Sequence, residues 1–228
     1  MRLAKQHLDV GLFTNRPDAM LAFWQREVGL PFEEALPTGG GNMQHRHGLN
    51  GGILKLNHSR EPLAEESPSG YARLLVASEA VTAPKDLVDP DGNAVALVPP
   101  GYRGITAAGI EIAVNSLPRA LAYYRGALGW EEAGEGIVRC GQTILFLSEQ
   151  PGRARSGAMR AKGFRYLTVQ VWDADSEYEA VVAAGGEGAL APRTLGSVAR
   201  FGFVRDPDGN WLETSQRASL TGALPPNA

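Results

Sequence analysis

The strongest chemical signal in the sequence is the clustering of all four histidines, His7, His45, His47 and His58, in its first 58 residues. His45 and His47 lie in a strand-like run, where alternate side chains share a face, so both imidazoles can reach one metal ion. A carboxylate such as Asp9 would complete a facial ligand set. Lys55 and Asn57 alternate in the next strand-like run. We expect these five residues to line one polar pocket, with an exposed hairpin as the alternative for the histidines.

A second group of candidates extends into the C-terminal half of the chain. Glu111 and Glu213 occupy separate strand-like runs, and two carboxylates whose strands meet provide a general base or a metal anchor. Trp211 shares a face with Glu213 and is expected to contact a substrate. Tyr71 and Tyr166 each open a strand-like run, and for both we weigh ligand contact against a half-buried position in the sheet.

The elements that must position these residues form an internal repeat. LAFWQREVGL at 21–30 recurs as LAYYRGALGW at 121–130, and DPDGN occurs at 89–93 and again at 206–210. Two repeated pairs in the same order indicate a duplicated half. In each copy a strand-like run leads into a helix whose apolar residues form one stripe, and each DPDGN has the composition of a tight turn.

The repeat divides the chain into two halves and a tail. We predict an N-terminal half over 1–102, a C-terminal half over 103–217 and a flexible tail over 218–228. The helix expected at 173–184 in the C-terminal half has no room in the N-terminal half, which we therefore expect to lack one helix. Gly29 and Gly129 stand where a residue with positive φ would end the first helix of each half.

This pattern resembles the vicinal-oxygen-chelate superfamily of glyoxalases, bleomycin-resistance proteins and extradiol dioxygenases. The motifs that carry the resemblance are GIEIAVNSLPRALAYYRGALGW and FVRDPDGNWLET, with weaker copies in DVGLFTNRPDAMLAFWQREVGL and LVDPDGNAVAL. The resemblance covers nearly the whole chain. It implies an α+β fold in which paired βαβββ modules form mixed sheets curled into cups. It leaves the chemistry open, because one fold hosts many functions.

The resemblance also implies where metal ligands would stand. Members that bind a metal take ligands from the first strand of each module and from the strand after DPDGN. The first-strand positions fall on Asp9, Tyr71, Gly109 and Tyr166, and the positions after DPDGN fall on Ala96 and Glu213; neither half carries a full set. We expect Asp9, His45, His47 and Glu213 as candidate ligands of a divalent ion such as Mn, Fe, Ni or Zn.

Composition restricts the partners. The 22 basic and 25 acidic residues give a net charge of −3 with no basic stripe, which argues against nucleic acid as a partner. MRLAKQHLDV has no apolar core of a signal peptide, and no segment has the length of a membrane span. We therefore expect a cytoplasmic protein without a membrane partner. The missing helix leaves one surface thinly covered, which favours a homodimer.

Two functions remain open at this point. The first is an enzyme of lyase, isomerase or ring-cleaving type that acts on a small oxygen-bearing molecule, with Glu213, Glu111 and Asp9 as catalytic candidates. In this hypothesis Lys55, Asn57, Tyr71, Tyr166 and Trp211 contact the substrate. The alternative is a metal-free protein that sequesters a small molecule, as bleomycin-resistance proteins do.

Overall fold

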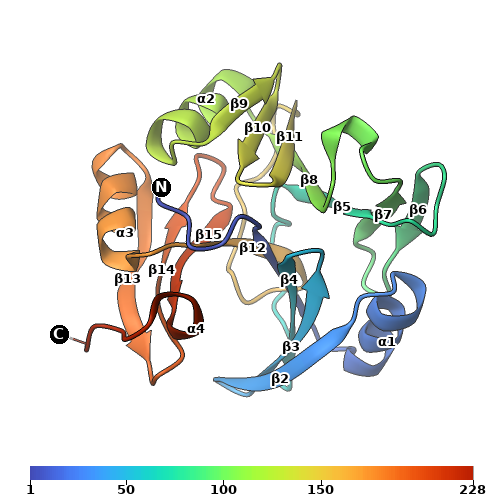
Figure 1. Ribbon diagram of the computed structural model, residues 1–228, viewed down its shortest axis with the longest axis horizontal. Helices are drawn as coiled ribbons and strands as arrows, with labels where there is room; N and C mark the ends of the chain where they lie inside the picture. The colour runs from blue at the N-terminus through green and yellow to red at the C-terminus, as the bar shows by residue number, and fades with distance from the viewer. Residues whose placement is uncertain (228) are drawn as a thin grey trace.

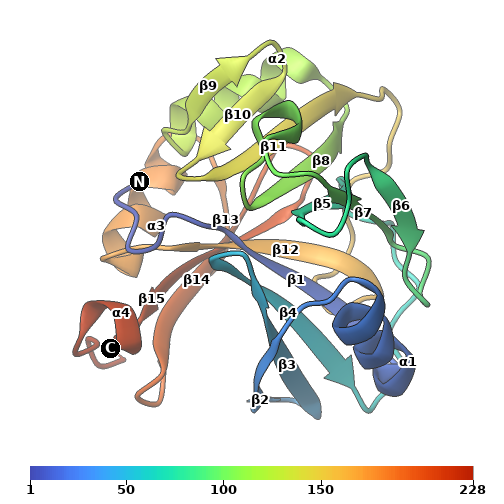
Figure 2. The same ribbon diagram turned by 45° about the vertical axis from the view of Figure 1, so that its right-hand side comes forward.

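The computed structural model, which describes residues 1–227, contains two curled mixed β-sheets with helices against them (Figure 1). This is the α+β architecture that the sequence predicts. The larger sheet has eight strands and the smaller has seven. The view in Figure 2 shows the smaller sheet above the larger one, with β1 and β12 crossing the middle of the molecule. Each sheet combines two modules of the chain.

The eight-stranded sheet joins the first and the last module. Its centre is the antiparallel pair of β1 and β12, flanked by β4 parallel to β1 and by β15 parallel to β12. The strands, in sheet order, are β13 (Glu187–Leu195), β14 (Ala199–Arg205), β15 (Trp211–Arg217), β12 (Gly163–Gln170), β1 (Asp9–Thr14), β4 (Gly52–Ser59), β3 (Asn42–Leu49) and β2 (Phe32–Gly39).

The seven-stranded sheet joins the two inner modules around the antiparallel pair of β5 and β8. Its strands, in sheet order, are β6 (Lys85–Val88), β7 (Ala94–Val98), β5 (Tyr71–Ala77), β8 (Ala108–Val114), β11 (Thr143–Glu149), β10 (Ile137–Cys140) and β9 (Glu131–Gly134). Strand β5 is followed directly by β6, so the helix that the sequence omits from the N-terminal half is absent from the described chain.

The helices are short. The first repeat forms α1 (Pro17–Ala22) and continues as the π-helical η1 (Phe23–Glu27), and the second forms α2 (Leu117–Leu121) and continues as η3 (Ala122–Ala127). The others are η2 (Tyr102–Gly104), α3 (Ala174–Ala183) and α4 (Ala218–Thr221). Gly29 and Gly129 follow the two repeat helices with φ of 82° and 66°, a conformation that side chains other than glycine rarely adopt.

One hydrophobic core joins the helix-facing sides of both sheets. It contains Leu12 and Leu54 from the larger sheet, Ile110 and Ile112 from the smaller sheet, and Trp24 from η1. The apolar stripe of each repeat helix therefore packs into a core that both sheets share. The opposite face of each sheet is left free, either to be filled by side chains or to hold a ligand.

The sheets do not follow the sequence halves. Residues 1–102 supply strands to both sheets, and so do residues 103–217. The halves therefore stay a proposal about duplication of the sequence. In the structure the first module (β1 to β4) shares a sheet with the last (β12 to β15), and the second (β5 to β7) shares a sheet with the third (β8 to β11). In the C-terminal segment, Ala218–Thr221 is helical and Asn227 accepts a hydrogen bond from the backbone of Thr194. Residue 228 lies outside the described residues.

Within residues 1–227, the helices are all too short or too polar to span a bilayer.

The two DPDGN turns have the same hydrogen bonds with one difference. Asp89 and Asp206 each accept from the backbone two and four residues ahead and from the side chain of the asparagine. Asp206 also accepts from the hydroxyl of the buried Tyr124 at 2.9 Å. The second turn is therefore tied to the core, and the first is not.

We expect Asp206→Ala to destabilise the protein more than Asp89→Ala, by about 1 kcal/mol or more, because it also leaves the Tyr124 hydroxyl without its partner. Urea unfolding of the two variants measures the difference. Equal losses would show that the Tyr124 contact contributes nothing to stability.

Candidate functional site

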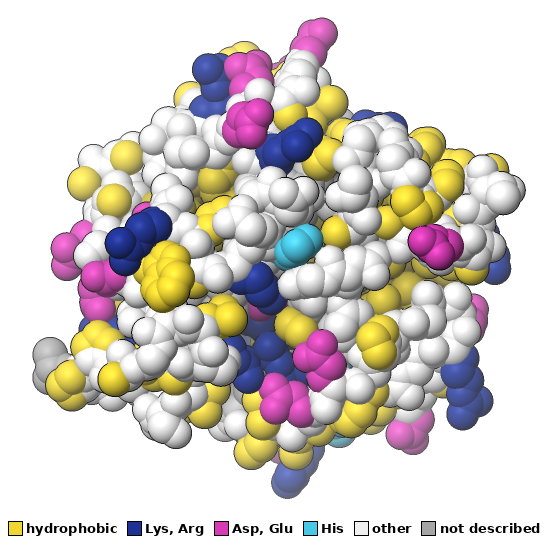
Figure 3. Space-filling model, in the orientation of Figure 1, with side chains coloured by type: hydrophobic (Ala, Val, Ile, Leu, Met, Phe, Trp, Pro, Cys, Tyr) yellow, Lys and Arg dark blue, Asp and Glu magenta, His cyan; other side chains and the backbone are white. Residues whose placement is uncertain are grey.

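The free face of the eight-stranded sheet encloses a cavity of about 430 Å³. We call this face the cup. Its lining comes from the central strands β1, β4, β12 and β15 and from the flanking strands β2, β3, β13 and β14. Figure 3 shows a hollow near the middle of the molecular face, between β2–β3 and α4, in which Lys and Arg side chains gather. The cavity has the size of a small-molecule site.

Lys55 provides the charge at the floor of the cup. Its ammonium group donates to Thr168 Oγ1 at 2.7 Å and to Glu213 Oε2 at 2.8 Å. The same ammonium lies 3.8 Å from Asp9 Oδ2. Only 5% of the Lys55 side chain is exposed, and 12% of that of Glu213. The structure therefore brings together three of the residues that the sequence nominates, on strands β1, β4 and β15.

Asp9 lies beneath this lysine and is completely buried. Its carboxylate accepts hydrogen bonds from Lys5 Nζ, from the Ile53 backbone and from Gln170 Nε2. Burial opposes ionisation of the carboxyl, but the charges of Lys55 and Lys5 and the bond from Gln170 outweigh it and hold the pKa of Asp9 below its usual value. Asp9 is therefore an anion that fixes the position of both lysines.

An aromatic wall rises beside the polar floor. The rings of Phe13 and Phe203 pack against Tyr166 with centroids 6.2 and 5.9 Å away, and Phe201 extends the wall beyond Phe203. Gly11 makes this packing feasible, because a Cβ there would lie 2.1 Å from the Tyr166 ring. The wall offers a planar apolar surface to a ligand.

Amide and guanidinium groups form the opposite side. Gln44 donates to Asn57 Oδ1, and Asn57 donates to the Tyr166 hydroxyl at 3.2 Å. Arg46, which is 5% exposed, donates to Gln44 Oε1 and forms an ion pair with Glu34 at 3.1 Å. Asn57 and Tyr166 therefore line the cavity, and their contact with a substrate stays a prediction. Burial raises the pKa of the Tyr166 phenol, which stays neutral.

The prediction that His45 and His47 face this pocket is wrong. They pair with Leu56 and Leu54 of β4, whose side chains belong to the core, so both imidazoles lie on the helix-facing side. His47 Nε2 is 3.1 Å from Gln25 Nε2, and burial lowers the pKa of His47 to about 4, so it stays neutral at pH 7. His45 stacks on His58, 6.5 Å away.

Three other predicted contact residues do not line the cavity. Glu111 belongs to β8 of the smaller sheet and pairs with Arg103 at 2.9 Å, so its strand does not meet that of Glu213. The Tyr71 side chain is buried in the shared core, and its hydroxyl donates to the carbonyl of Trp211. Trp211 shares a face with Glu213, as the sequence predicts, but its ring packs edge-on against Phe203 and donates to the carbonyl of Gly157, and it does not line the cavity.

The corresponding face of the seven-stranded sheet is filled. Leu75, Ala96 and Phe146 pack there against Ile105, which comes from the connection between β7 and β8. These side chains occupy the space that the larger sheet leaves as a cavity. Ala96 and Gly109 stand at positions where the family resemblance implies metal ligands. Here both lie in a filled apolar cluster and provide no polar group.

Several residues of the cup were missed by sequence reasoning. Gln44 and Arg46 take the inward positions expected for the histidines, and Thr168, Gln170, Arg193 and Arg217 complete the polar lining or its floor. The turn Asn50-Gly51 could have predicted that Gln44 and Arg46 face inward. Its two residues have φ of 46° and 94°. A two-residue turn at that place pairs Leu49 with Gly52 and thereby sets His45 and His47 opposite leucines.

The residues at the floor do not fit a divalent ion. Asp9 and Glu213 are held by hydrogen bonds to Lys5, Thr168 and Lys55, and the Lys55 ammonium occupies the space between the two carboxylates. A doubly charged ion at that point would be repelled by the ammonium. In residues 1–227, His, Cys, Asp and Glu side chains form no cluster of three or more suited to metal coordination.

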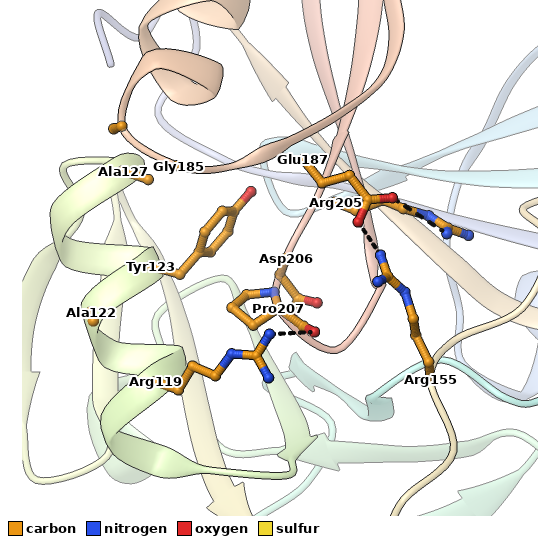
Figure 4. Close-up of a pocket in the computed structure, with 11 residues that line it drawn as sticks. Arg119, Ala122, Tyr123, Ala127, Arg155, Gly185, Glu187, Arg205, Asp206 and Pro207 are labelled. Carbon is orange, nitrogen blue, oxygen red and sulfur yellow. Dashed lines mark hydrogen bonds and ion pairs between the residues drawn. The ribbon is translucent and has the colours of Figure 1, made fainter.

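A second cavity, of about 340 Å³, lies between η3 and the start of β13 (Figure 4). Tyr123 points into it from the helix, and its buried hydroxyl has no partner among the described residues. Arg155 and Arg205 both form ion pairs with Glu187 there. Tyr123 is the one aromatic ring among the described residues that line this cavity, whereas the cup combines an aromatic wall with the charged floor, so the cup remains the candidate site.

Comparisons with known proteins agree with this architecture. Residues 106–214 match the model of the Glyoxalase/Bleomycin resistance protein/Dioxygenase superfamily. A search of curated proteins finds no significant match. A crystal structure of a point mutant of glyoxalase I from Zea mays is similar over 94% of this chain and 93% of its own, with a TM-score of 0.73 and 15% identity.

Two further solved structures share the fold. A protein from Bacillus subtilis, provisionally assigned as a dioxygenase, covers 95% of this chain and 86% of its own, with a TM-score of 0.69 and 12% identity. The cppA protein from Streptococcus pneumoniae covers 95% of this chain and 100% of its own, with a TM-score of 0.54 and 10% identity. At these identities the likeness shows the fold alone.

The lowered pKa of Asp9 predicts acid sensitivity. The unfolded chain binds this proton more readily than the folded protein, so the stabilisation by Asp9 is complete above the ordinary value of 3.8 and is lost as the pH falls through the lowered pKa. We expect Asp9→Asn to reduce the free energy of unfolding by about 3 kcal/mol at pH 7, because it leaves Lys5 and Lys55 undercompensated.

Urea unfolding at pH 7 and pH 3 tests this expectation, with Asp18→Asn on the exposed face of α1 as the control. The difference between wild type and Asp9→Asn should shrink at pH 3. A difference that is the same at both pH values would contradict the role of the Asp9 charge.

Proposed function

The chain belongs to the vicinal-oxygen-chelate superfamily, and on that premise we propose that its cup binds a small organic anion without a divalent metal. The observation that carries this proposal is the composition of the cavity wall. Four basic residues line it, Arg46, Lys55, Arg193 and Arg217, against the single acidic Glu213. Glu34 pairs with Arg46 and Arg217, and Asp9 lies beside Lys55, so among the described residues Arg193 is the lining cation that has no carboxylate partner. A concave surface with an excess of positive charge attracts and orients anions.

The rest of the ligand follows from the other walls. The rings of Phe13, Tyr166 and Phe203 suit a planar apolar body. Asn42 Oδ1 and Gln170 Oε1 are buried acceptors at the cavity without a partner among the described residues. Buried acceptors are normally satisfied, so a ligand with hydroxyl or amide donors fits them. The proposed ligand class is an aromatic acid that carries hydrogen-bond donors.

Binding of this kind matches the sequestering function that the sequence left open. The Lys55 ammonium and the carboxylates that hold it are already fixed by hydrogen bonds before any ligand arrives. Such preorganisation lowers the cost of binding. The whole cup is built by one chain, so the homodimer suggested by the missing helix is not needed to complete it and stays a separate proposal.

Two dyes with the same skeleton test the proposal. The anion 1-anilinonaphthalene-8-sulfonate should bind at least about tenfold more tightly than neutral N-phenyl-1-naphthylamine, the size of effect expected of one charge-assisted contact. Chelation with EDTA should leave both affinities unchanged. Fluorescence titration measures the two constants, and displacement by 3-phenyllactate extends the test to an aromatic hydroxy acid.

Matched variants locate the dye. Phe203→Leu should weaken binding, whereas Phe146→Leu, which alters the filled face of the smaller sheet, should not. Equal binding of the two dyes would contradict the anionic ligand, and equal effects of the two substitutions would contradict the cup as the site.

A second candidate function is proton transfer by Glu213. Both hydrogen bonds to its carboxylate, from Lys55 and Thr168, end on Oε2, and Oε1 has no bond among the residues described. A carboxylate held in this way at a cavity wall can remove a proton from carbon next to a carbonyl group. This role belongs to the lyase or isomerase type of enzyme predicted from the sequence.

Deuterium exchange distinguishes an enzyme from a binding protein. If Glu213 is a base, the wild type incorporates deuterium from D2O into aromatic keto acids such as phenylpyruvate faster than buffer does, and Glu213→Gln loses this acceleration by at least about 100-fold. NMR follows the exchange. Equal rates with both proteins would remove Glu213 as the base.

A further inference from the structure

The eight-stranded sheet has an internal two-fold symmetry that relates four positions as two pairs. Strands β1 and β12 pair antiparallel, with Asp9 opposite Thr168 and Gly11 opposite Tyr166. The two-fold axis between these strands therefore relates Asp9 to Tyr166 and Gly11 to Thr168. Both of the related positions, Asp9 and Tyr166, are first-strand positions at which the superfamily places metal ligands.

The same symmetry extends to the flanking strands. Lys55 of β4 lies beside Gly11, and Glu213 of β15 lies beside Thr168, each in a parallel pair. Because the axis exchanges Gly11 with Thr168, it also exchanges Lys55 with Glu213. Glu213 is the position after DPDGN that the superfamily uses for a carboxylate ligand. Lys55 therefore occupies the fourth ligand position, where its symmetry mate is an acid.

The side chain of Lys55 reaches into the centre of the other three positions. Its Nζ is 2.8 Å from Glu213 Oε2, 3.8 Å from Asp9 Oδ2 and 5.5 Å from the centre of the Tyr166 ring. Two carboxylates and an aromatic face thus surround one positive charge. These are the surroundings that a bound cation would have.

We propose that the Lys55 ammonium is the resident cation of the cup, in the place of a divalent metal, and that replacing this lysine with a metal ligand converts the cup into a metal site. The ammonium has three N–H groups, of which Thr168 and Glu213 accept two, and the third remains for an oxygen of the ligand. This ligand contact rests on the function proposed above, whereas the conversion to a metal site does not.

The test is the gain of metal binding in Lys55→Glu, with Lys55→His as a second variant. Either substitution removes the ammonium and adds a ligand to Asp9 and Glu213. We expect one equivalent of Mn²⁺, Ni²⁺ or Zn²⁺ per chain by elemental analysis. At an ion concentration about 100-fold above the dissociation constant, the melting temperature should rise by roughly 5 to 10 °C. The wild type should show neither effect.

A matched control is Lys162→Glu, which changes the same charge at an exposed lysine that pairs with Glu65. It should not gain an ion. If the Lys55 variants fold only when the ion is present, the circular dichroism recovered on adding metal supports the proposal equally. The proposal is overturned if neither variant binds an ion or regains structure with any of the three metals, or if the wild type binds one equivalent itself.

The dye titrations described above separate this failure from failure of the proposed function. If Lys55→Glu gains a metal but the wild type binds no aromatic anion, the resident cation stands and the ligand class is wrong. If the wild type binds the anion but neither Lys55 variant gains a metal, the ligand class stands and the resident cation is wrong.

Discussion

The ion pair between Lys55 and Glu213 is the interaction on which the cup depends. Asp9 adds a second carboxylate to the same charge, and all three groups are largely removed from water. Isolated charges in such a place would be strongly unfavourable, so each group requires the others. Thr168 and Gln170 complete the arrangement by bonding to the carboxylates. The polar floor is therefore one cooperative unit, and any ligand must meet it as it stands.

This unit exists because the first and last modules share a sheet. Lys55 and Glu213 are 158 residues apart in the chain, and they meet only because β1 pairs with β12. The inner modules pair in the same way, but Phe146 and Ile105 fill their free face. The two sheets are built in the same way, but their free faces differ. That of the eight-stranded sheet holds a charged cavity, and that of the seven-stranded sheet is packed with apolar side chains that stabilise the fold.

Much of the fold follows from local sequence patterns, and part of the site does too. The repeated helices and the DPDGN turns are present as predicted, and no helix lies between β5 and β6 in the described chain. Asp9, Lys55 and Glu213 were nominated and do meet. The histidines were misplaced because all four residues from Gln44 to His47 are polar, so alternation alone could not assign the faces of the strand. Which modules pair was not predictable, because hydrophobic periodicity describes a strand and not its distant partner.

A crystal structure of the wild-type protein grown with Mn²⁺ tests the central claim most directly. We predict density for the Lys55 ammonium within hydrogen-bonding distance of Glu213 and Thr168, and no anomalous signal from manganese in the cup. A manganese peak coordinated by Asp9 and Glu213, with Lys55 turned away, would contradict the account.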